Sequence, residues 1–101
     1  ASDVYKRQIE AWESAVECGM DPRVAMTRIG DACLSLNDLP GAEESYREAL
    51  AKGYDKWAHL GLAKIHLRRN EKSRARDILA MLLEKEPNDT RVILLYQQVE
   101  K

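Results

Sequence analysis

The chain has 101 residues, of which 45% are hydrophobic and 33% charged, and its formal net charge is −1. This composition indicates one folded domain with a charged surface and disfavours an intrinsically disordered chain. The small net charge argues against general nucleic-acid binding, which usually shows a strong basic excess. The apolar runs are shorter than the ~18–20 residues of a membrane-spanning helix.

The first predicted helix begins at an Asp3 cap and carries apolar residues at spacings of four, three and four. These spacings place the side chains on one helical face. The face consists of Tyr5, Ile9, Trp12 and Val16. Gly19 ends this helix, because glycine readily adopts the left-handed conformation that closes many helices.

An aspartate followed by a proline then marks two further helix starts. Asp21 and Pro22 begin the second predicted helix, which stops near residues 37–38, and Asp38 and Pro40 begin the third. The aspartate accepts amide hydrogen bonds at the cap, and proline fits the first turn because its missing N–H has no intrahelical partner there.

The second half of the chain shows the same punctuation. Gly53 ends the third predicted helix, Asp55 caps the fourth, and Asn70 breaks it. A fifth helix runs to about residue 84, and the turn at residues 87–89 precedes a sixth over residues 90–101. No segment alternates with the period of two that a half-exposed strand requires.

The helices repeat at a regular interval along the chain. One recurring position is Trp12, Tyr46 and Leu79; a second, three residues later, is Ala15, Ala49 and Leu82; a third, in the intervening helices, is Ile29, Leu62 and Tyr96. The period of about 34 residues is typical of stacked helical hairpins.

At these residues the sequence resembles the tetratricopeptide-repeat family. Residues 23–56 carry Ile29-Gly30 where the family has Leu-Gly, and a small, an aromatic and a small residue at Ala42, Tyr46 and Ala49. Residues 57–89 match through Leu62-Ala63, Ala75, Leu79 and Pro87. Residues 3–20 resemble the second helix of a preceding repeat, and residues 90–101 the first helix of a following repeat or a capping helix.

The resemblance implies an all-α fold. Six antiparallel helices would stack as hairpins in a short right-handed solenoid, and residues 1–101 would form one domain. Gly30 and Ala63 would keep one helix surface flat so that its partner approaches closely. A bulky residue at Gly30 or Ala75 is expected to overpack that interface and to cost ~1–3 kcal/mol.

The resemblance also implies a protein-interaction module, not an enzyme, in which the first helix of each hairpin lines a concave groove that holds a peptide or a helix. The groove-facing candidates by register are Thr27, Asp31 and Leu34, then Trp57, Leu60, Lys64 and Arg68, and finally Arg91, Leu94 and Gln98. The asparagines with which some members clamp a C-terminal carboxylate are missing, so we do not expect that kind of ligand.

We expect binding to centre on Trp57, Lys64, Arg68 and Arg91. The first three share a helical face by their spacing of seven and four residues. Tryptophan and arginine are favoured at binding hot spots, so the pattern predicts an acidic peptide with an apolar anchor. The alternative interpretation is that Trp57 covers the neighbouring hairpin and that the cations are solvated.

Catalytic and metal-binding motifs are not found in the sequence, and we expect no cofactor. His59 and His66 lie two helical turns apart, ~10 Å between their Cα atoms, and zinc needs three or four close ligands. They are interpreted as partly buried core residues. Cys18 and Cys33 form no metal-binding spacing and are interpreted as buried thiols, with a disulfide as the minor alternative.

Two other functions compete with peptide binding. The end helices, with apolar residues such as Ile93, Leu95 and Tyr96, suggest a slice of a longer scaffold that self-associates through its ends. A less favoured interpretation is an RNA-binding helical repeat that uses the basic run of residues 68–76, which lacks interleaved aromatics. That run is interpreted first as solvated surface.

The location and source of the chain are weaker expectations. No basic segment followed by an apolar run and a cleavage site marks a secretory signal, so we expect a cytoplasmic protein, or a periplasmic one if a longer parent carries a signal. Residues 57–63 resemble repeats appended to bacterial signalling proteins such as response regulators, which implies a bacterial parent.

Overall fold

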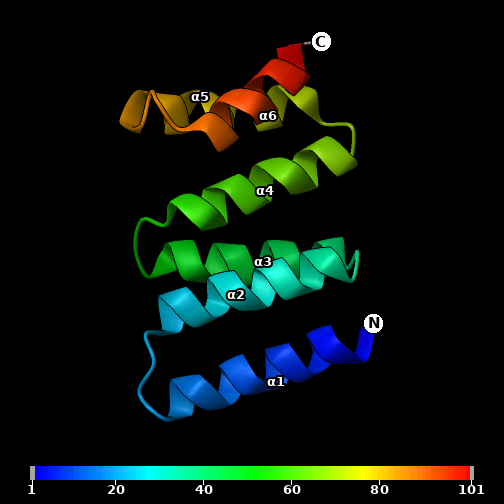
Figure 1. Ribbon diagram of the computed structural model, residues 1–101, viewed down its shortest axis with the longest axis vertical. Coiled ribbons are helices and arrows are strands. Elements are labelled where there is room, and N and C mark those ends of the chain that lie inside the picture. The colour runs from blue at the N-terminus through cyan, green and yellow to red at the C-terminus, as the bar shows by residue number, and fades with distance from the viewer. Residues whose placement is uncertain (1, 101) are drawn as a thin grey trace.

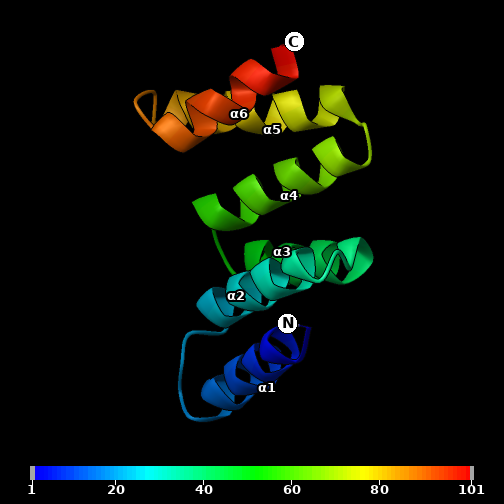
Figure 2. The ribbon, with the colours of Figure 1, turned by 45° about the vertical axis from the view of Figure 1, so that its right-hand side comes forward.

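Each helix of the computed structural model, which describes residues 2–100, packs on the helix that precedes it along the chain. The regular elements in that range are α1 (Ser2–Glu17), α2 (Pro22–Ser35), α3 (Leu39–Ala51), α4 (Lys56–Arg68), α5 (Lys72–Lys85) and α6 (Thr90–Glu100). They stack along the longest dimension, with the first and last helices at opposite ends (Figures 1 and 2). The all-α prediction is confirmed.

Aspartates cap four of the helices, as the sequence indicates for three of them. Asp21 accepts a hydrogen bond from the Arg23 amide at 2.9 Å, and Asp38 from the Gly41 amide at 3.1 Å. The caps of α4 and α6 are Asp55 and Asp89. Each side chain satisfies an amide that has no partner inside its helix.

The predicted cap at Asp3 is wrong. Helix α1 already begins at Ser2, so Asp3 lies within its first turn. A negative charge in that turn still stabilises the helix, because it faces the positive end of the helix dipole.

Left-handed residues end the helices near the predicted points. Gly19 follows α1 with φ of 103°, Asn37 follows α2 with φ of 60°, and Asn70 follows α4 with φ of 62°. This conformation reverses the chain and allows the next helix to fold back antiparallel. The hairpins α2–α3 and α4–α5 have the closest packing in the stack.

Two adjoining clusters make up the core. The first lies among α2, α3 and α4 around Tyr46, whose exposed fraction is 0%. The second lies among α4, α5 and α6 around Leu79, also fully buried. The small residues that the repeat pattern places between helices, Ala42, Ala49, Ala63 and Ala75, are likewise at 0%.

Tyr46 is packed between two glycines from different helices. A Cβ atom on Gly30 of α2 would lie only 2.6 Å from its ring, and one on Gly61 of α4 would lie closer still. The predicted close approach at Gly30 is therefore present. The equivalent role of Gly61 was not predicted from the sequence.

The cysteines differ in their environments. Cys33 is buried in the first cluster, as expected, but Cys18 is exposed and both are free thiols. The prediction of burial is wrong for Cys18 because α1 ends at Glu17, which leaves this side chain in the turn before Gly19. No helix within residues 2–100 has the length and apolar character needed to cross a membrane.

Candidate partner-binding cleft

A cleft of about 560 Å³ lies between α2, α4 and the first turn of α6. Helix α2 contributes Arg28, Asp31, Leu34 and Ser35; helix α4 contributes Trp57, Leu60, Gly61, Lys64 and Arg68; helix α6 contributes Arg91. These three helices are alternate members of the stack, so they lie side by side although the chain passes through α3 and α5 between them (Figures 1 and 2).

The structure brings most of the predicted site residues to this cleft. Those that line it are Asp31, Leu34, Trp57, Leu60, Lys64, Arg68 and Arg91. The helical register of α4 explains the grouping, since residues four and seven apart share a face.

Three predicted residues do not line the cleft. Thr27 is 4% exposed, and its hydroxyl donates to the Asp55 carboxylate at 3.1 Å, so it joins α2 to the cap of α4. Leu94 and Gln98 are exposed on α6 but lie outside the lining. Only the first turn of α6 reaches the cleft, through Arg91.

Arg28, Ser35 and Gly61 line the cleft and were not predicted from the sequence. The signal for two of them is the helical spacing around Asp31: Arg28 precedes it by three residues and Ser35 follows it by four. Choosing Thr27 in place of Arg28 shifted the predicted face of α2 by one residue, about 100° around the helix.

Trp57 forms an exposed aromatic wall of the cleft. Its exposed fraction is 43%, and the Arg91 guanidinium carbon lies 4.9 Å from the ring centroid, with the Lys56 ammonium 4.8 Å from it. Two caps fix this arrangement: Asp55 binds the Trp57 amide at 2.8 Å, and Asp89 binds the Arg91 amide at 3.0 Å. Cations near the face of tryptophan are attracted by its ring quadrupole.

Arg68 closes the far end of the cleft and ties α4 to α2. Its Nη1 donates to the Leu34 carbonyl oxygen at 2.9 Å and contacts the Asn37 side chain at 3.5 Å. The Leu34 carbonyl belongs to the last turn of α2, where carbonyl groups lack intrahelical partners. Arg68 therefore has a structural bond in addition to a charge that faces the cleft.

Asp31 contributes the one carboxylate among the lining residues. Its Oδ1 accepts a hydrogen bond from the Tyr46 hydroxyl at 2.5 Å. Burial raises the pKa of the Asp31 carboxyl, and the hydrogen bond from Tyr46 and the charges of Arg28 and Lys64 act in the opposite direction. The side chain thus anchors Tyr46 from the cleft side of α2.

The cleft has a net positive lining above an apolar floor. Arg28, Lys64, Arg68 and Arg91 face a single lining carboxylate. Within residues 2–100, none of these four cations has a carboxylate oxygen within salt-bridge distance. Leu34 and Leu60 beneath them are 8% and 3% exposed. The arrangement can attract negative charge and bury an apolar group.

The histidines have separate environments. His66 is buried, and its Nδ1 lies 3.0 Å from the Glu71 carboxylate. His59 stacks at 5.6 Å on Tyr54, and burial lowers its pKa. In the part of the chain that the structure describes, no three His, Cys, Asp or Glu side chains are grouped so as to hold a metal ion.

Comparison with known families agrees with the stacked hairpins and the alternate-helix cleft. A family model described as tetratricopeptide repeat matches residues 24–99. The chain belongs to the tetratricopeptide-repeat family. Tetratricopeptide repeats are generally protein-interaction modules and are typically non-catalytic scaffolds. No curated protein matches the chain.

Proposed function

We propose that this tetratricopeptide-repeat chain is a non-catalytic adaptor that holds an acidic peptide in the cleft between α2, α4 and α6, as part of a larger bacterial protein. The observation that carries the proposal is the convergence of Arg28, Lys64, Arg68 and Arg91 around the exposed ring of Trp57. The repeat fold itself supports only the general role in protein binding.

Charge gives the peptide its expected sign. The four cations have no salt-bridge partner in the described chain, so an acidic ligand would gain attraction without first breaking an internal pair. Arg68 would contribute least, because its Nη1 is already bound to the Leu34 carbonyl. Lys64 and Arg91 are the cations whose reversal should affect binding most.

Trp57 gives the peptide its expected anchor. This residue is exposed to a substantial degree, although a buried position would be more favourable for so large an apolar group. An apolar side chain of the ligand would cover the ring and extend over Leu60. Burying such a side chain contributes ~1.5–3 kcal/mol, and the surrounding cations would orient the acidic residues that flank it.

A random-peptide display library offers a probe that does not require the native partner. Selection on the full chain should enrich peptides with at least two acidic residues next to a large apolar one. A synthetic enriched peptide should bind the unmodified chain and lose most of its affinity for the double variant Lys64→Glu, Arg91→Glu. Raising the salt concentration should weaken binding only in part, because the apolar anchor is not screened.

The matched control reverses two cations on α5. Lys72 and Arg76 are exposed and lie outside the cleft, so Lys72→Glu with Arg76→Glu changes the net charge equally. This control should bind like the unmodified chain. Enrichment of basic peptides, or equal losses in both double variants, would contradict the proposal.

A further inference from the structure

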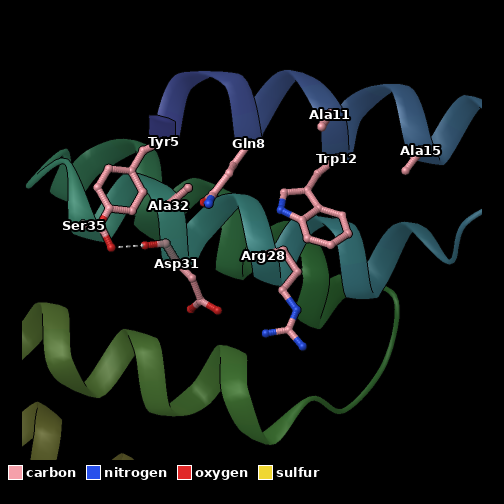
Figure 3. A pocket seen from close by; sticks show the side chains of 9 residues that line it. All are labelled: Tyr5, Gln8, Ala11, Trp12, Ala15, Arg28, Asp31, Ala32 and Ser35. Carbon is pink, nitrogen blue, oxygen red and sulfur yellow. Dashed lines mark hydrogen bonds between the residues drawn. The ribbon is translucent and has the colours of Figure 1, made fainter. Parts of the chain in front are cut away.

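A second groove, of about 620 Å³, runs between α1 and α2 (Figure 3). Its α1 wall consists of Tyr5, Gln8, Ala11, Trp12 and Ala15. The indole of Trp12 and the phenol of Tyr5 project from α1 toward α2, and the two alanines leave the surface near Trp12 low (Figure 3). This wall is therefore largely apolar and shaped by one large ring beside small residues.

The α2 wall is lined by Arg28, Asp31, Ala32 and Ser35. The side chains of Arg28 and Asp31 extend toward α4, away from α1, and Ser35 donates to the Asp31 carbonyl at 3.1 Å (Figure 3). Ala32 is 4% exposed. The groove thus has its apolar part against α1 and its polar edge against the cleft described above.

The α1 wall has a buried counterpart in the same molecule. Trp12 and Tyr46 occupy equivalent positions of successive repeats, and so do Ala15 and Ala49. Tyr46 and Ala49 are fully buried. The helix that covers them on one side is α2, which places Gly30 against the Tyr46 ring. The corresponding place beside Trp12 is the open groove.

The α2 wall has a counterpart on α4. Ser35 is equivalent in the repeat to Arg68, and Ala32 is equivalent to Ile65. Arg68 binds the Leu34 carbonyl of α2, and Ile65 is fully buried in the core that α2 shares. The two walls of the groove therefore correspond to the two surfaces, on α3 and α4, between which α2 itself is seated.

We infer that the α1–α2 groove binds an amphipathic helix of a partner protein that presents a branched aliphatic residue followed by glycine or alanine to Trp12. The two helices that pack on equivalent walls both carry this pair, as Ile29-Gly30 in α2 and Leu62-Ala63 in α4. The small residue admits the large ring, and the aliphatic residue fills the space beside it. This surface is distinct from the peptide cleft, and its ligand is helical instead of extended.

A second copy of this chain is a poor occupant. The helix in the same register at the other end of the molecule is α6, which has Tyr96-Gln97 where α2 has Ile29-Gly30. Gln97 is exposed, as expected of a polar outer face on a terminal helix. Its side chain would occupy the space that the ring of Trp12 needs, so the groove favours a helix from a different protein.

The helix α2 supplies the probe, because it already fits the equivalent seat. A fluorescein-labelled peptide of residues 20–37, with Arg28→Lys and Ala32→Glu joined by a lactam bridge, would be held helical on the face opposite Gly30. Helix stabilisation is needed because isolated helices shorter than ~12–15 residues are marginal in water. Titration with the full chain should give a saturable rise in fluorescence anisotropy. The Gly30→Leu peptide should bind about tenfold more weakly or not at all, because overpacking against the ring costs ~1–3 kcal/mol.

Variants of the chain locate the binding surface. Ala11 is exposed on the α1 wall, so Ala11→Glu and Ala11→Arg should retain the helical circular dichroism spectrum and both lose peptide binding. The Lys64→Glu, Arg91→Glu variant should bind this peptide normally. The reverse result, with loss in the cleft variant only, would overturn the inference, as would the absence of any saturable binding.

Two other outcomes would also overturn it. Binding that is insensitive to both Ala11 variants would mean that the peptide exchanges with the chain's own α2 on α3. Sedimentation should show a monomer at the concentrations of the titration. A dimer that Ala11→Glu dissociates would assign the groove to a second copy and not to a partner helix.

Discussion

Tyr46 and Trp12 occupy the same position in successive turns of the repeat, yet they have different environments. Tyr46 is fully buried between Gly30 and Gly61, and its hydroxyl donates to Asp31. Trp12 packs on the first core cluster from its edge and lines an open groove. The difference shows that the sequence pattern sets where a large ring is placed, whereas the helices on either side decide whether it is buried.

This dependence on neighbours follows from the way repeat proteins are built. Each hairpin contacts only the adjacent ones, so an interface that lacks one helix leaves its large residue partly in solvent. The consequence is that equivalent substitutions at the two rings should have unequal effects on stability.

The largest expected effect is that of Tyr46→Ala. Removing a fully buried aromatic ring leaves a cavity between α2, α3 and α4 and should lower the free energy of unfolding by about 4 kcal/mol. Trp12→Ala should cost less than half as much, although its ring is larger, because it is only partly buried. Urea unfolding followed by circular dichroism would measure both. Equal losses would contradict the comparison and imply that the groove is closed in solution.

A second comparison concerns two helix caps of the same chemistry. Asp21 is exposed and binds the Arg23 amide, whereas Asp55 is 5% exposed and also binds the Arg23 guanidinium and the Thr27 hydroxyl. Asp21→Ala should therefore cost about 1 kcal/mol, the value of a cap alone. Asp55→Ala should cost about 3 kcal/mol, because it leaves partly buried partners without their acceptor. Denaturant midpoints of the two variants test this order, and a smaller loss at Asp55 would contradict it.

Most of the fold could be predicted because its signals are local or periodic. The Asp-Pro starts, the residues after each helix, and the regular spacing of Trp12 and Tyr46 depend on helical geometry alone. The burial of Cys18 was mispredicted for a related reason. An apolar residue one position beyond a helix end leaves the helical face, and end positions are the least certain part of such an assignment.

The candidate cleft was harder to predict because its details depend on contacts between distant segments. Trp57, Lys64 and Arg68 follow from the register of one helix. Thr27 was misplaced because it faces Asp55, which lies far along the chain in the turn before α4. Gly61 was not identified because its importance depends on Tyr46 and becomes visible only when α3 and α4 are packed together.

The third prediction tests the glycine contacts directly. Gly30→Ala places a Cβ atom 2.6 Å from the buried Tyr46 ring, so overpacking of ~1–3 kcal/mol should exceed the ~1 kcal/mol gained in helix propensity. In the Tyr46→Ala background the same change should be neutral or stabilising. Urea unfolding of the four proteins gives the coupling between the two sites. If Gly30→Ala has the same effect in both backgrounds, the close approach is not what constrains this position.

The smallest expected effect lies at the junction of α4 and α6, where the ion pair is nearer to solvent than the Asp55 contacts between α2 and α4. Lys56 pairs with Asp89 and with Glu86, the latter at 3.0 Å. The hydrogen bond from Lys56 lowers the pKa of Asp89 below its ordinary 3.8, and burial acts in the opposite direction. A carboxyl whose pKa is lowered by folding stabilises the folded state above the unfolded value and loses that contribution as the pH falls.

The variant Asp89→Asn isolates this contribution, because asparagine caps a helix about as well as aspartate. Its melting temperature should be slightly below that of the unmodified chain at pH 7, by less than the Asp55→Ala variant, since Lys56 retains Glu86 as a partner. The gap should narrow as the pH falls below 3.8 and when salt screens the pair. A gap that is unchanged by pH would mean that Asp89 acts only through its hydrogen bonds to the Arg91 and Val92 amides. The first turn of α6, with Arg91 beside Trp57, would then be held without the aid of the Lys56 charge.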